Sequence, residues 1–343
     1  MNVAQSYARV HGGTDLHGAP AHDFSTNANS AGPCPDALEA VRQADASRYP
    51  EPGYQVLREQ LAQLHGVDSA RIVVGASASE LIFRITAWAC REGARTAWVP
   101  PHAYGDYRAA AGAWRLQPRT LPQQADLCWC CEPSNPLGQC EPQLEQADLA
   151  RATWAMDRAY EPLRLGGSPR PKVLLDKVWQ LRSPNKSLGL TGVRAAYAIA
   201  PQHAEAQARE LEELSHSWPL GAHGLALLQA WCTPGVQQWL RESLLRLRAW
   251  KQQQIDVCRA LGWQVAASDA NFFCARPSVD DLGAVIAGLR EAGIKLRDCA
   301  SFGLPGWVRL GVLPPPSQTA LASEWSRVTV QQQPSPAPPS PSS

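Results

Sequence analysis

The sequence predicts an α/β protein with a large domain, whose mostly parallel central sheet is sandwiched by helices, and a small α+β domain. Two observations lead to this prediction. Short apolar runs alternate with helical stretches as far as about residue 200, which is typical of a sheet covered by helices on both faces. With 343 residues, of which 45% are hydrophobic, the chain is also long enough to bury the cores of two domains.

Four segments are predicted along the chain. Residues 1–33 form an N-terminal arm, rich in Asn, Ser, Gly and Pro, a composition typical of irregular structure with many side-chain to backbone hydrogen bonds or of a disordered tail. Residues 34–233 form the large domain, and residues 234–330 form the small domain. The Pro/Ser-rich segment 331–343 is of low complexity, so we expect it to be disordered.

The expected elements follow from runs of apolar residues. In the large domain, strands are predicted at 72–74, 97–99, 127–131, 153–156, 173–175, 178–181 and 194–199. A helix is predicted from Leu81 to Cys90, and a long one with an apolar stripe from Pro234 to Leu261. The small domain is then expected to contain strands at 271–273, 294–297 and 307–312 and helices at 279–292 and 317–328.

The composition of the chain argues against nucleic acid, a membrane surface and a metal ion as binding partners. The net charge is +1 and basic residues are not clustered, which argues against nucleic acid or a membrane surface as partner. No apolar run reaches 18 residues and no signal pattern is visible, so a cytoplasmic protein is expected. The ten cysteines are interpreted as reduced and buried. Four of them, Cys128, Cys130, Cys131 and Cys140, lack CxxC spacing, and no metal site is predicted.

The segment Ser183 to Arg194, SPNKSLGLTGVR, brings together an amine, a hydroxyl and a guanidinium. Lysine is scarce, with five among 32 basic residues, and Lys186 lies among small and polar residues. A lysine held in a pocket beside another cation has a lowered pKa and becomes a nucleophile toward an aldehyde. Ser183 and Arg194 would bind an anion nearby, since an arginine fork and a hydroxyl both suit phosphate oxygens. Considered alone, Lys186 is a loop lysine and Arg194 a surface charge.

Two upstream segments agree with this one, and together the three resemble the fold-type I pyridoxal-phosphate (PLP) enzymes. Asn135 in EPSNPLG resembles that family's asparagine loop, and Asp157 with Tyr160 in WAMDRAYEP resembles its strand end. The resemblance implies PLP as cofactor, with Lys186, Asp157 and Tyr160 as catalytic residues. Asp157 would pair with the pyridine nitrogen and Tyr160 with the ring oxygen, while Asn135 would be a nearby donor.

Other likenesses extend this set of cofactor-binding residues. Tyr104 in HAYGDY aligns with the aromatic that stacks on the pyridine ring, although His102 stands where relatives usually have proline. Ala76 and Ser77 match in part the family's phosphate-binding turn at a helix start. Tyr49 in RYP resembles the tyrosine that reaches the cofactor phosphate of the neighbouring subunit, which implies a homodimer with shared active sites. Without these likenesses, each tyrosine is an ordinary loop aromatic.

Both ends of the chain resemble the threonine-phosphate decarboxylases of cobalamin synthesis. HGG at 11–13 and DFSTNANSAGP at 23–33 resemble their N-terminal signature, while LRDCASFGLPG and GWVRLGV resemble the segments that carry their substrate arginines. In that group the arm folds over the active site. The resemblance implies that the substrate, a small phosphorylated amino acid, is bound by His11, Gly12, Asn27, Asn135, Arg297 and Arg309.

The activity implied by this resemblance is PLP-dependent decarboxylation of L-threonine O-3-phosphate to (R)-1-aminopropan-2-yl phosphate. Histidinol-phosphate aminotransferases share the cofactor motifs and an equivalent of Arg309, so an aminotransferase is the alternative activity. A non-catalytic PLP-binding homologue is a third possibility. It would keep the cofactor pocket without a competent substrate site, and the intact His11, Asn27, Arg297 and Arg309 count against it.

Overall fold

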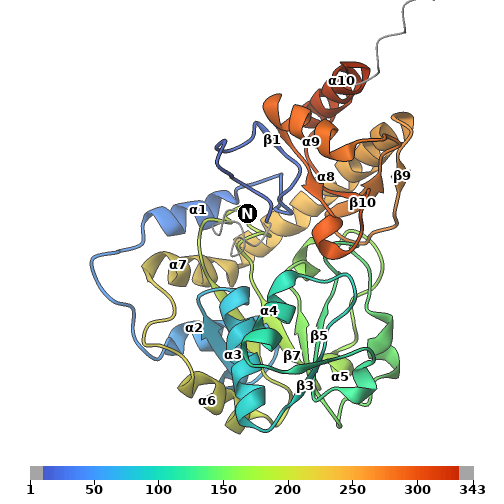
Figure 1. Ribbon diagram of the computed structural model, residues 1–343. Helices are drawn as coiled ribbons and strands as arrows, with labels where there is room; N and C mark the ends of the chain where they lie inside the picture. The colour runs from blue at the N-terminus through green and yellow to red at the C-terminus, as the bar shows by residue number, and fades with distance from the viewer. Residues whose placement is uncertain (1–10, 332–343) are drawn as a thin grey trace, which may run out of the picture.

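The computed structural model of the protein describes residues 11–331 (Figure 1). The strands are β1 (His22–Asp23), β2 (Ile72–Gly75), β3 (Thr96–Trp98), β4 (Gln117–Arg119), β5 (Leu127–Cys131), β6 (Thr153–Asp157), β7 (Trp179–Arg182), β8 (Ala196–Ile199), β9 (Gln264–Val265), β10 (Phe272–Arg276), β11 (Ile294–Lys295), β12 (Arg297–Asp298) and β13 (Val308–Gly311). The helices are α1 (Pro35–Arg42), α2 (Gln55–His65), α3 (Ala78–Arg91), α4 (Gly105–Ala113), α5 (Lys172–Leu175), α6 (Glu205–Glu213), α7 (Ala222–Trp231), α8 (Pro234–Ala260), α9 (Leu282–Glu291) and α10 (Pro315–Gln331).

Seven strands form one large sheet in the order β2-β8-β7-β6-β5-β3-β4. Strand β8 is antiparallel to both of its neighbours, and every other neighbouring pair in this sheet is parallel. The mostly parallel sheet is therefore confirmed. Because β8 is reversed, its amino end lies at the same edge as the carboxyl ends of the other strands. Segments that precede β8 and segments that follow β5, β6 and β7 consequently meet at one edge.

Helices cover both faces of the large sheet, and its strands apart from the exposed edge strand β4 are therefore almost entirely buried. Helices α3, α4 and α6 pack on one face, where Leu81, Tyr107 and Trp129 belong to one apolar cluster. Helices α1, α2 and α7 pack on the other face with Leu57 and Leu227. Alternate residues of β8 point to the two clusters, as the pleat of a strand requires.

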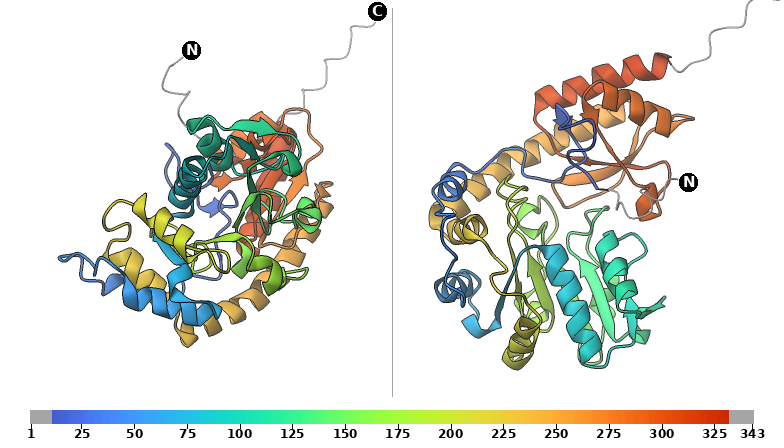
Figure 2. Two further views of the ribbon diagram at one scale, coloured as in Figure 1. Left: turned by 90° about the horizontal axis from the view of Figure 1, so that it is seen from below. Right: turned by 60° about the vertical axis from the view of Figure 1, so that its left-hand side comes forward.

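A four-stranded antiparallel sheet, β12-β13-β10-β9, forms the core of the smaller part of the molecule together with α9 and α10. Helix α8 extends from the large sheet to this small sheet (Figure 2). Its residues Val236, Leu240 and Leu247 belong to the core beside the large sheet, whereas Cys258 belongs to the core of the small sheet. The predicted domain boundary at residues 233 and 234 thus falls where a helix shared by both cores begins.

The N-terminal arm is attached to the small-sheet part. Strand β1 pairs in parallel with β11, and the backbone amide of Gly311 donates to the carbonyl of Phe24 over 2.7 Å. Asp15 forms ion pairs with Arg290 and Lys295, each at 2.8 Å. Described residues of the predicted arm therefore lie against the small sheet, and residues 1–10 of that prediction fall outside the described part of the chain.

Most of the predicted elements are present, but two predicted strands differ. The run 294–297, predicted as one strand, forms the two short strands β11 and β12, because β11 pairs with β1 of the arm and β12 pairs with β13 of the small sheet. The run 173–175, predicted as a strand, is the one-turn helix α5, since Pro171 precedes it and the Val173 side chain is exposed. Strand β4 was not predicted, because its residues Gln-Pro-Arg are all exposed and carry no apolar pattern. Gln331, placed in the predicted tail, is the last residue of α10, and the rest of that tail lies outside the described residues.

Candidate active site

A cavity of about 740 Å³ lies at the edge of the large sheet where β5, β6 and β7 end. Its lining includes twelve of the residues predicted from the sequence: His11, Gly12, Asn27, Tyr104, Asn135, Asp157, Tyr160, Ser183, Lys186, Arg194, Arg297 and Arg309. A larger hollow of about 1020 Å³ on the small-sheet part, lined by Arg276 and Asp280, contains none of them. The convergence of distant segments on one cavity identifies it as the candidate site.

Asp157 and Lys186 are the oppositely charged pair at the sheet edge. Asp157 is the last residue of β6, after a run of buried residues, and Lys186 lies in the turn that follows β7. Burial lowers the pKa of the Lys186 amine, and the charge of Arg194 lowers it further, while the Asp157 carboxylate opposes the shift. Burial likewise raises the pKa of Asp157. A lowered amine pKa increases the fraction of uncharged, nucleophilic lysine.

Tyr107 holds the Asp157 carboxylate and was not among the predicted site residues. Its hydroxyl donates to Oδ2 of Asp157 over 2.8 Å, and the amide of Ala159 donates to Oδ1 over 2.9 Å. The Tyr107 ring is fully buried and stacks on Trp129 with 5.2 Å between the ring centroids. Tyr107 lies in the first turn of α4, and its partner Asp157 is 50 residues away in the sequence.

Tyr160 and Tyr104 supply aromatic walls. Nζ of Lys186 lies 5.5 Å from the centroid of the Tyr160 ring, which packs edge-on against Phe272. Burial raises the pKa of Tyr160 to about 12, so its hydroxyl stays protonated at neutral pH. The Tyr104 hydroxyl lies 3.2 Å from Oγ of Ser79, at the start of α3. This contact joins the aromatic wall to a helix N-terminus.

The cationic edge of the cavity is formed by Arg194 and the start of α3. Arg194 is exposed and lies two residues before β8, and Ser183 Oγ donates to Oδ1 of Asn185 over 2.9 Å. The predicted Ala76 and Ser77 do not line the cavity. The Ala76 amide donates to the Glu80 carboxylate, and Ser77 Oγ accepts from the Glu80 amide as the cap of α3. The next two residues, Ala78 and Ser79, lie in the cavity wall instead.

Arg309 and Arg297 reach the cavity from β13 and β12 of the small sheet, where they are directly opposite each other. Arg309 donates to Asn135 Oδ1 and to the carbonyl of Ser25, at 2.5 and 2.6 Å, and its Nε has no hydrogen-bond partner among the described residues. Arg297 donates to Ser301 Oγ over 2.7 Å. Burial lowers the pKa of Arg297, and the neighbouring charge of Arg309 adds to the shift.

The arm completes the cavity wall. The His11 ring lies 6.0 Å from that of Tyr104. Gly12 has no room for a side chain, because a Cβ there would lie 2.1 Å from the carbonyl oxygen of Ser25. The buried amide oxygen of Asn27 has no hydrogen-bond partner within residues 11–331. The backbone amide of Asn29 also donates to the carbonyl of Lys186 over 2.8 Å, so the arm contacts the lysine segment directly.

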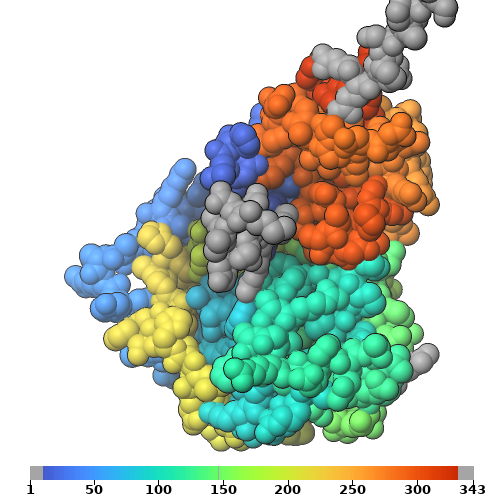
Figure 3. All heavy atoms as spheres, in the orientation of Figure 1, coloured from blue at the N-terminus to red at the C-terminus, as the bar shows by residue number. Residues whose placement is uncertain are grey.

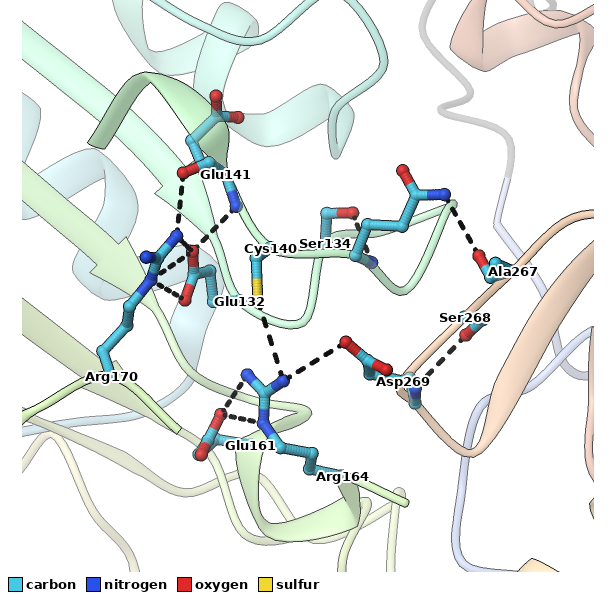
Figure 4. A network of polar contacts seen from close by, with 12 residues as sticks. Glu132, Ser134, Cys140, Glu141, Glu161, Arg164, Arg170, Ala267, Ser268 and Asp269 are labelled. Atoms are coloured by element: carbon cyan, nitrogen blue, oxygen red, sulfur yellow. Dashed lines mark hydrogen bonds and ion pairs between the residues drawn. The ribbon is translucent and has the colours of Figure 1, made fainter. Parts of the chain in front are cut away.

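Polar contacts hold the loop that carries Asn135 at both of its ends. Arg170 donates to both oxygens of Glu132 at one end of the loop, and Arg164 lies between Glu161 and Asp269 at the other (Figure 4). The amide of Asp269 donates to the carbonyl of Gly138 over 2.7 Å. Glycine is required at position 138, where φ is +72° and a Cβ would lie 2.0 Å from Ser268 Oγ.

Tyr49 does not line the cavity of its own chain. Its side chain is 78% exposed, and its ring stacks on Trp218 with 4.4 Å between the centroids. The predicted contact with a neighbouring subunit concerns a second chain, so it stays a prediction.

The described part of the chain shows neither a metal-binding cluster nor a membrane-spanning helix. Between residues 11 and 331, no three His, Cys, Asp or Glu side chains are grouped so as to hold a metal ion. Cys128, Cys130 and Cys131 lie on buried β5, and burial raises the pKa of each thiol. None of the described helices has the length and apolar character needed to span a bilayer.

Comparison with known proteins identifies the family. The sequence profile of "Aminotransferase class I and II" matches residues 20–323. The chain belongs to this family. Its relatives include a histidinol-phosphate aminotransferase of Jannaschia sp. (strain CCS1), which is 27% identical over 331 residues that cover 88% of this chain and 89% of the relative.

Solved structures show the same fold. Histidinol-phosphate aminotransferase from Sinorhizobium meliloti, in complex with pyridoxal-5'-phosphate, superposes with a TM-score of 0.77 at 21% identity and covers 91% of this chain and 92% of that one. L-threonine-O-3-phosphate decarboxylase from Porphyromonas gingivalis superposes with a TM-score of 0.70 at 21% identity, covering 88% and 96%. The predicted fold-type I architecture is therefore confirmed.

Pyridoxal 5'-phosphate is the cofactor expected for an enzyme of this family, and the cavity suits it chemically. An amine of lowered pKa and a buried carboxylate line one cavity with three phenols. A helix N-terminus and Arg194 lie at the same cavity and offer donors suited to a phosphate. The chain is thus a PLP-dependent enzyme of the aminotransferase class I and II family.

Proposed function

We propose that the protein decarboxylates L-threonine O-3-phosphate to (R)-1-aminopropan-2-yl phosphate. The observation that carries this proposal is the side of the cavity formed by the arm and the small sheet. His11 and Gly12 of the arm and the opposed pair Arg297 and Arg309 all line the cavity that contains Lys186. These are the residues that resemble the substrate-binding set of the threonine-phosphate decarboxylases. Two guanidinium groups match a substrate with two anionic groups, a carboxylate and a phosphate.

In this proposal the residues of the large-sheet edge hold the cofactor. Lys186 would bind its aldehyde, Asp157 its ring nitrogen and Tyr160 its ring oxygen, and Tyr104 would contact the ring. The phosphate is bound by Ser183, Arg194 and the first turn of α3, where Ala78 and Ser79 replace Ala76 and Ser77 as the nearest amides. When bound, the cofactor withdraws electrons from a bond at the substrate Cα. The chain's part is to choose which bond breaks.

The substrate-binding residues make that choice by orientation. Arg309, held by Asn135 and the Ser25 carbonyl, binds one anionic group in a fixed direction, and Arg297, held by Ser301, binds the other. The Nε of Arg309 and the amide oxygen of Asn27, which have no hydrogen-bond partner in the described part of the chain, could contact the substrate. Binding both ends of the substrate fixes the rotation about the bond between Cα and nitrogen, which sets the position of the carboxylate.

The decisive experiment compares two substrates. Purified protein loaded with PLP is given L-threonine O-3-phosphate without any oxo acid, and separately histidinol phosphate with 2-oxoglutarate. We expect CO2 release from the first mixture and no glutamate from the second. Replacing Arg297 with alanine should cost about 2 to 5 kcal/mol of transition-state binding, because the charge it pairs with loses its partner. Glutamate formation without CO2 release would reject the decarboxylase in favour of the aminotransferase.

An aminotransferase acting on histidinol phosphate is the second candidate. It is supported by the relatives, several of which are histidinol-phosphate aminotransferases at 25 to 28% identity. A non-catalytic PLP-binding homologue is disfavoured, because both arginines and the arm line the cavity.

We also propose that the protein is a homodimer. Tyr49 is 78% exposed beside Trp218, and Val56 is exposed nearby in the sequence, so these apolar side chains are available to a second subunit. In the dimer Tyr49 would reach the cofactor phosphate of the partner.

A further inference from the structure

His102 joins the two halves of the molecule beside the cavity. It lies in the segment between β3 and α4, and its Nδ1 is 2.8 Å from the carbonyl oxygen of Phe302 in the small-sheet part. Since a carbonyl oxygen only accepts, Nδ1 carries the proton in this contact. The imidazole also approaches Gly303, where a Cβ would lie 3.5 Å from Nδ1. Figure 3 shows segments of these two colours, teal and orange-red, packed against each other.

The turn contacted by His102 supports Arg297. It is a single 3-10 turn, η6 (Ala300–Phe302), which follows β12. Ser301 in this turn accepts a hydrogen bond from Nη2 of Arg297 over 2.7 Å. The Arg297 guanidinium also lies 4.7 Å from the centroid of the Phe302 ring, and that of Arg309 lies 6.0 Å from it. Ser301 and Phe302 of this turn, which also line the cavity, therefore contact Arg297, and the Phe302 ring lies near Arg309.

The backbone hydrogen bonds that hold the turn are local, and its one buried side chain, Phe302, packs in an apolar cluster with Cys274 and Cys299. Within it, the Phe302 amide donates to Cys299 and the Gly303 amide to Ala300, both over 2.9 Å, and Gly303 has φ of +76°. Ser301 and Gly303 are exposed to solvent. A turn with so little buried surface opens locally unless contacts with neighbouring elements hold it, as the packing of Phe302 does in part. The hydrogen bond from His102 supplies such a restraint from the large-sheet side.

We infer that His102 is a positioning residue: by holding the 300–303 turn against the large sheet, it fixes Arg297 in the direction needed to bind the anionic substrate. This inference rests on the proposed function for the identity of that anion. An arginine side chain has high rotamer entropy, so a support that restrains it before binding lowers the cost of ordering it in the complex. His102 touches neither substrate nor cofactor, and it acts through Ser301 and Phe302.

The first test is hydrogen exchange of the whole PLP-loaded protein, measured on peptides that cover residues 299–304. His102→Ala should speed exchange of these amides, because it removes the restraint on the turn. The matched control is Gln139→Ala, which removes a different single hydrogen bond between the halves, from Gln139 Nε2 to the carbonyl of Ala267 at 3.1 Å. The control should leave peptides 299–304 unchanged. Equal exchange in wild type and His102→Ala would overturn the inference.

The second test separates binding from chemistry. With L-threonine O-3-phosphate, His102→Ala should raise KM about fivefold, the factor that corresponds to one hydrogen bond of ordinary net strength, with little change in kcat. His102→Asn should restore KM, because the Nδ2 of asparagine stands as many bonds from Cα as Nδ1 does and also donates. A kcat loss at constant KM, or no rescue by asparagine, would contradict the positioning role. If wild type releases no CO2, the proposed function fails, and the exchange comparison still decides the role of His102.

Discussion

The two walls of the cavity are built differently. In the wall at the large-sheet edge, Asp157 ends β6 and is held in register between Cys131 and Leu181, and Lys186 lies in the turn that follows β7. The opposite wall carries Arg297 and Arg309, whose positions depend on contacts with the arm, with the Asn135 loop and with an exposed turn. Asp157 is thus positioned by the large sheet, whereas Arg297 and Arg309 lie on paired strands of the small sheet and are held by further contacts with separate parts of the chain.

Replacing Lys186, in the wall at the large-sheet edge, should have the largest effect. Lys186→Ala should abolish the covalent attachment of PLP and reduce activity by at least about a thousandfold, since a positioned acid–base group alone contributes up to about 10⁴. Borohydride reduction of wild type should fix the cofactor on the peptide that contains Lys186, which is identifiable among only five lysines. Labelling of another lysine in Lys186→Ala would contradict the role of Lys186.

The second prediction concerns Lys251, a buried lysine near the loop that carries Asn135. Lys251 of α8 donates to the carbonyls of Ser268 and Ala270, in the segment that contacts the Asn135 loop, and burial lowers its pKa to about 8. Below pH 8 the amine is charged in both the native and the unfolded state. Between about 8 and its ordinary value near 10.5, the unfolded chain keeps a proton that the native state has lost, so the free energy of unfolding rises with pH.

Lys251→Met should remove this rise, which amounts to about 3 kcal/mol if fully developed. The measurement is urea unfolding at pH 7.5 and pH 10, for wild type and variant. Lys172→Met is the control, since the Lys172 side chain is 64% exposed and lies on the surface. Identical pH dependence in wild type and Lys251→Met would show that Lys251 does not titrate in this range.

The third prediction concerns Tyr107, which contacts Asp157 at the large-sheet edge of the cavity. Tyr107→Phe keeps the ring stacked on Trp129 but removes the donor to Asp157, so the pKa of that carboxyl should rise further. The charged carboxylate that binds a protonated ring nitrogen is then less populated. We expect PLP affinity to fall by about 2 kcal/mol, the usual worth of a hydrogen bond to a charged group, with the larger loss at low pH. Equilibrium dialysis between pH 6 and pH 8 measures the PLP affinity. Unchanged affinity in Tyr107→Phe would show that the Tyr107 hydroxyl does not support cofactor binding.

The smallest effect is expected at the subunit contact. Tyr49→Phe should weaken PLP retention by about 1 kcal/mol, and dilution of wild type to monomers should do the same. Sedimentation combined with cofactor absorbance tests both statements. A monomer that keeps its full PLP content would exclude a shared site.

The sequence predicted what depends on local pattern. Strands β5 and β6 are buried runs, and the residues of the first wall lie in short motifs near such runs. Strand β4 was missed, because its exposed residues are held by pairing with β3 and not by burial. Tyr107 and the His102 contact were missed for another reason. Their partners lie 50 and 200 residues away, and only the folded chain brings them together.

Helix α8 links the stability of the two halves. Its 27 residues form one uninterrupted helix, with apolar side chains in the core beside the large sheet at one end and in that of the small sheet at the other. Neither half can open at its core without exposing part of this helix to water. The two sheets should therefore unfold in a single cooperative transition, although each has a core of its own.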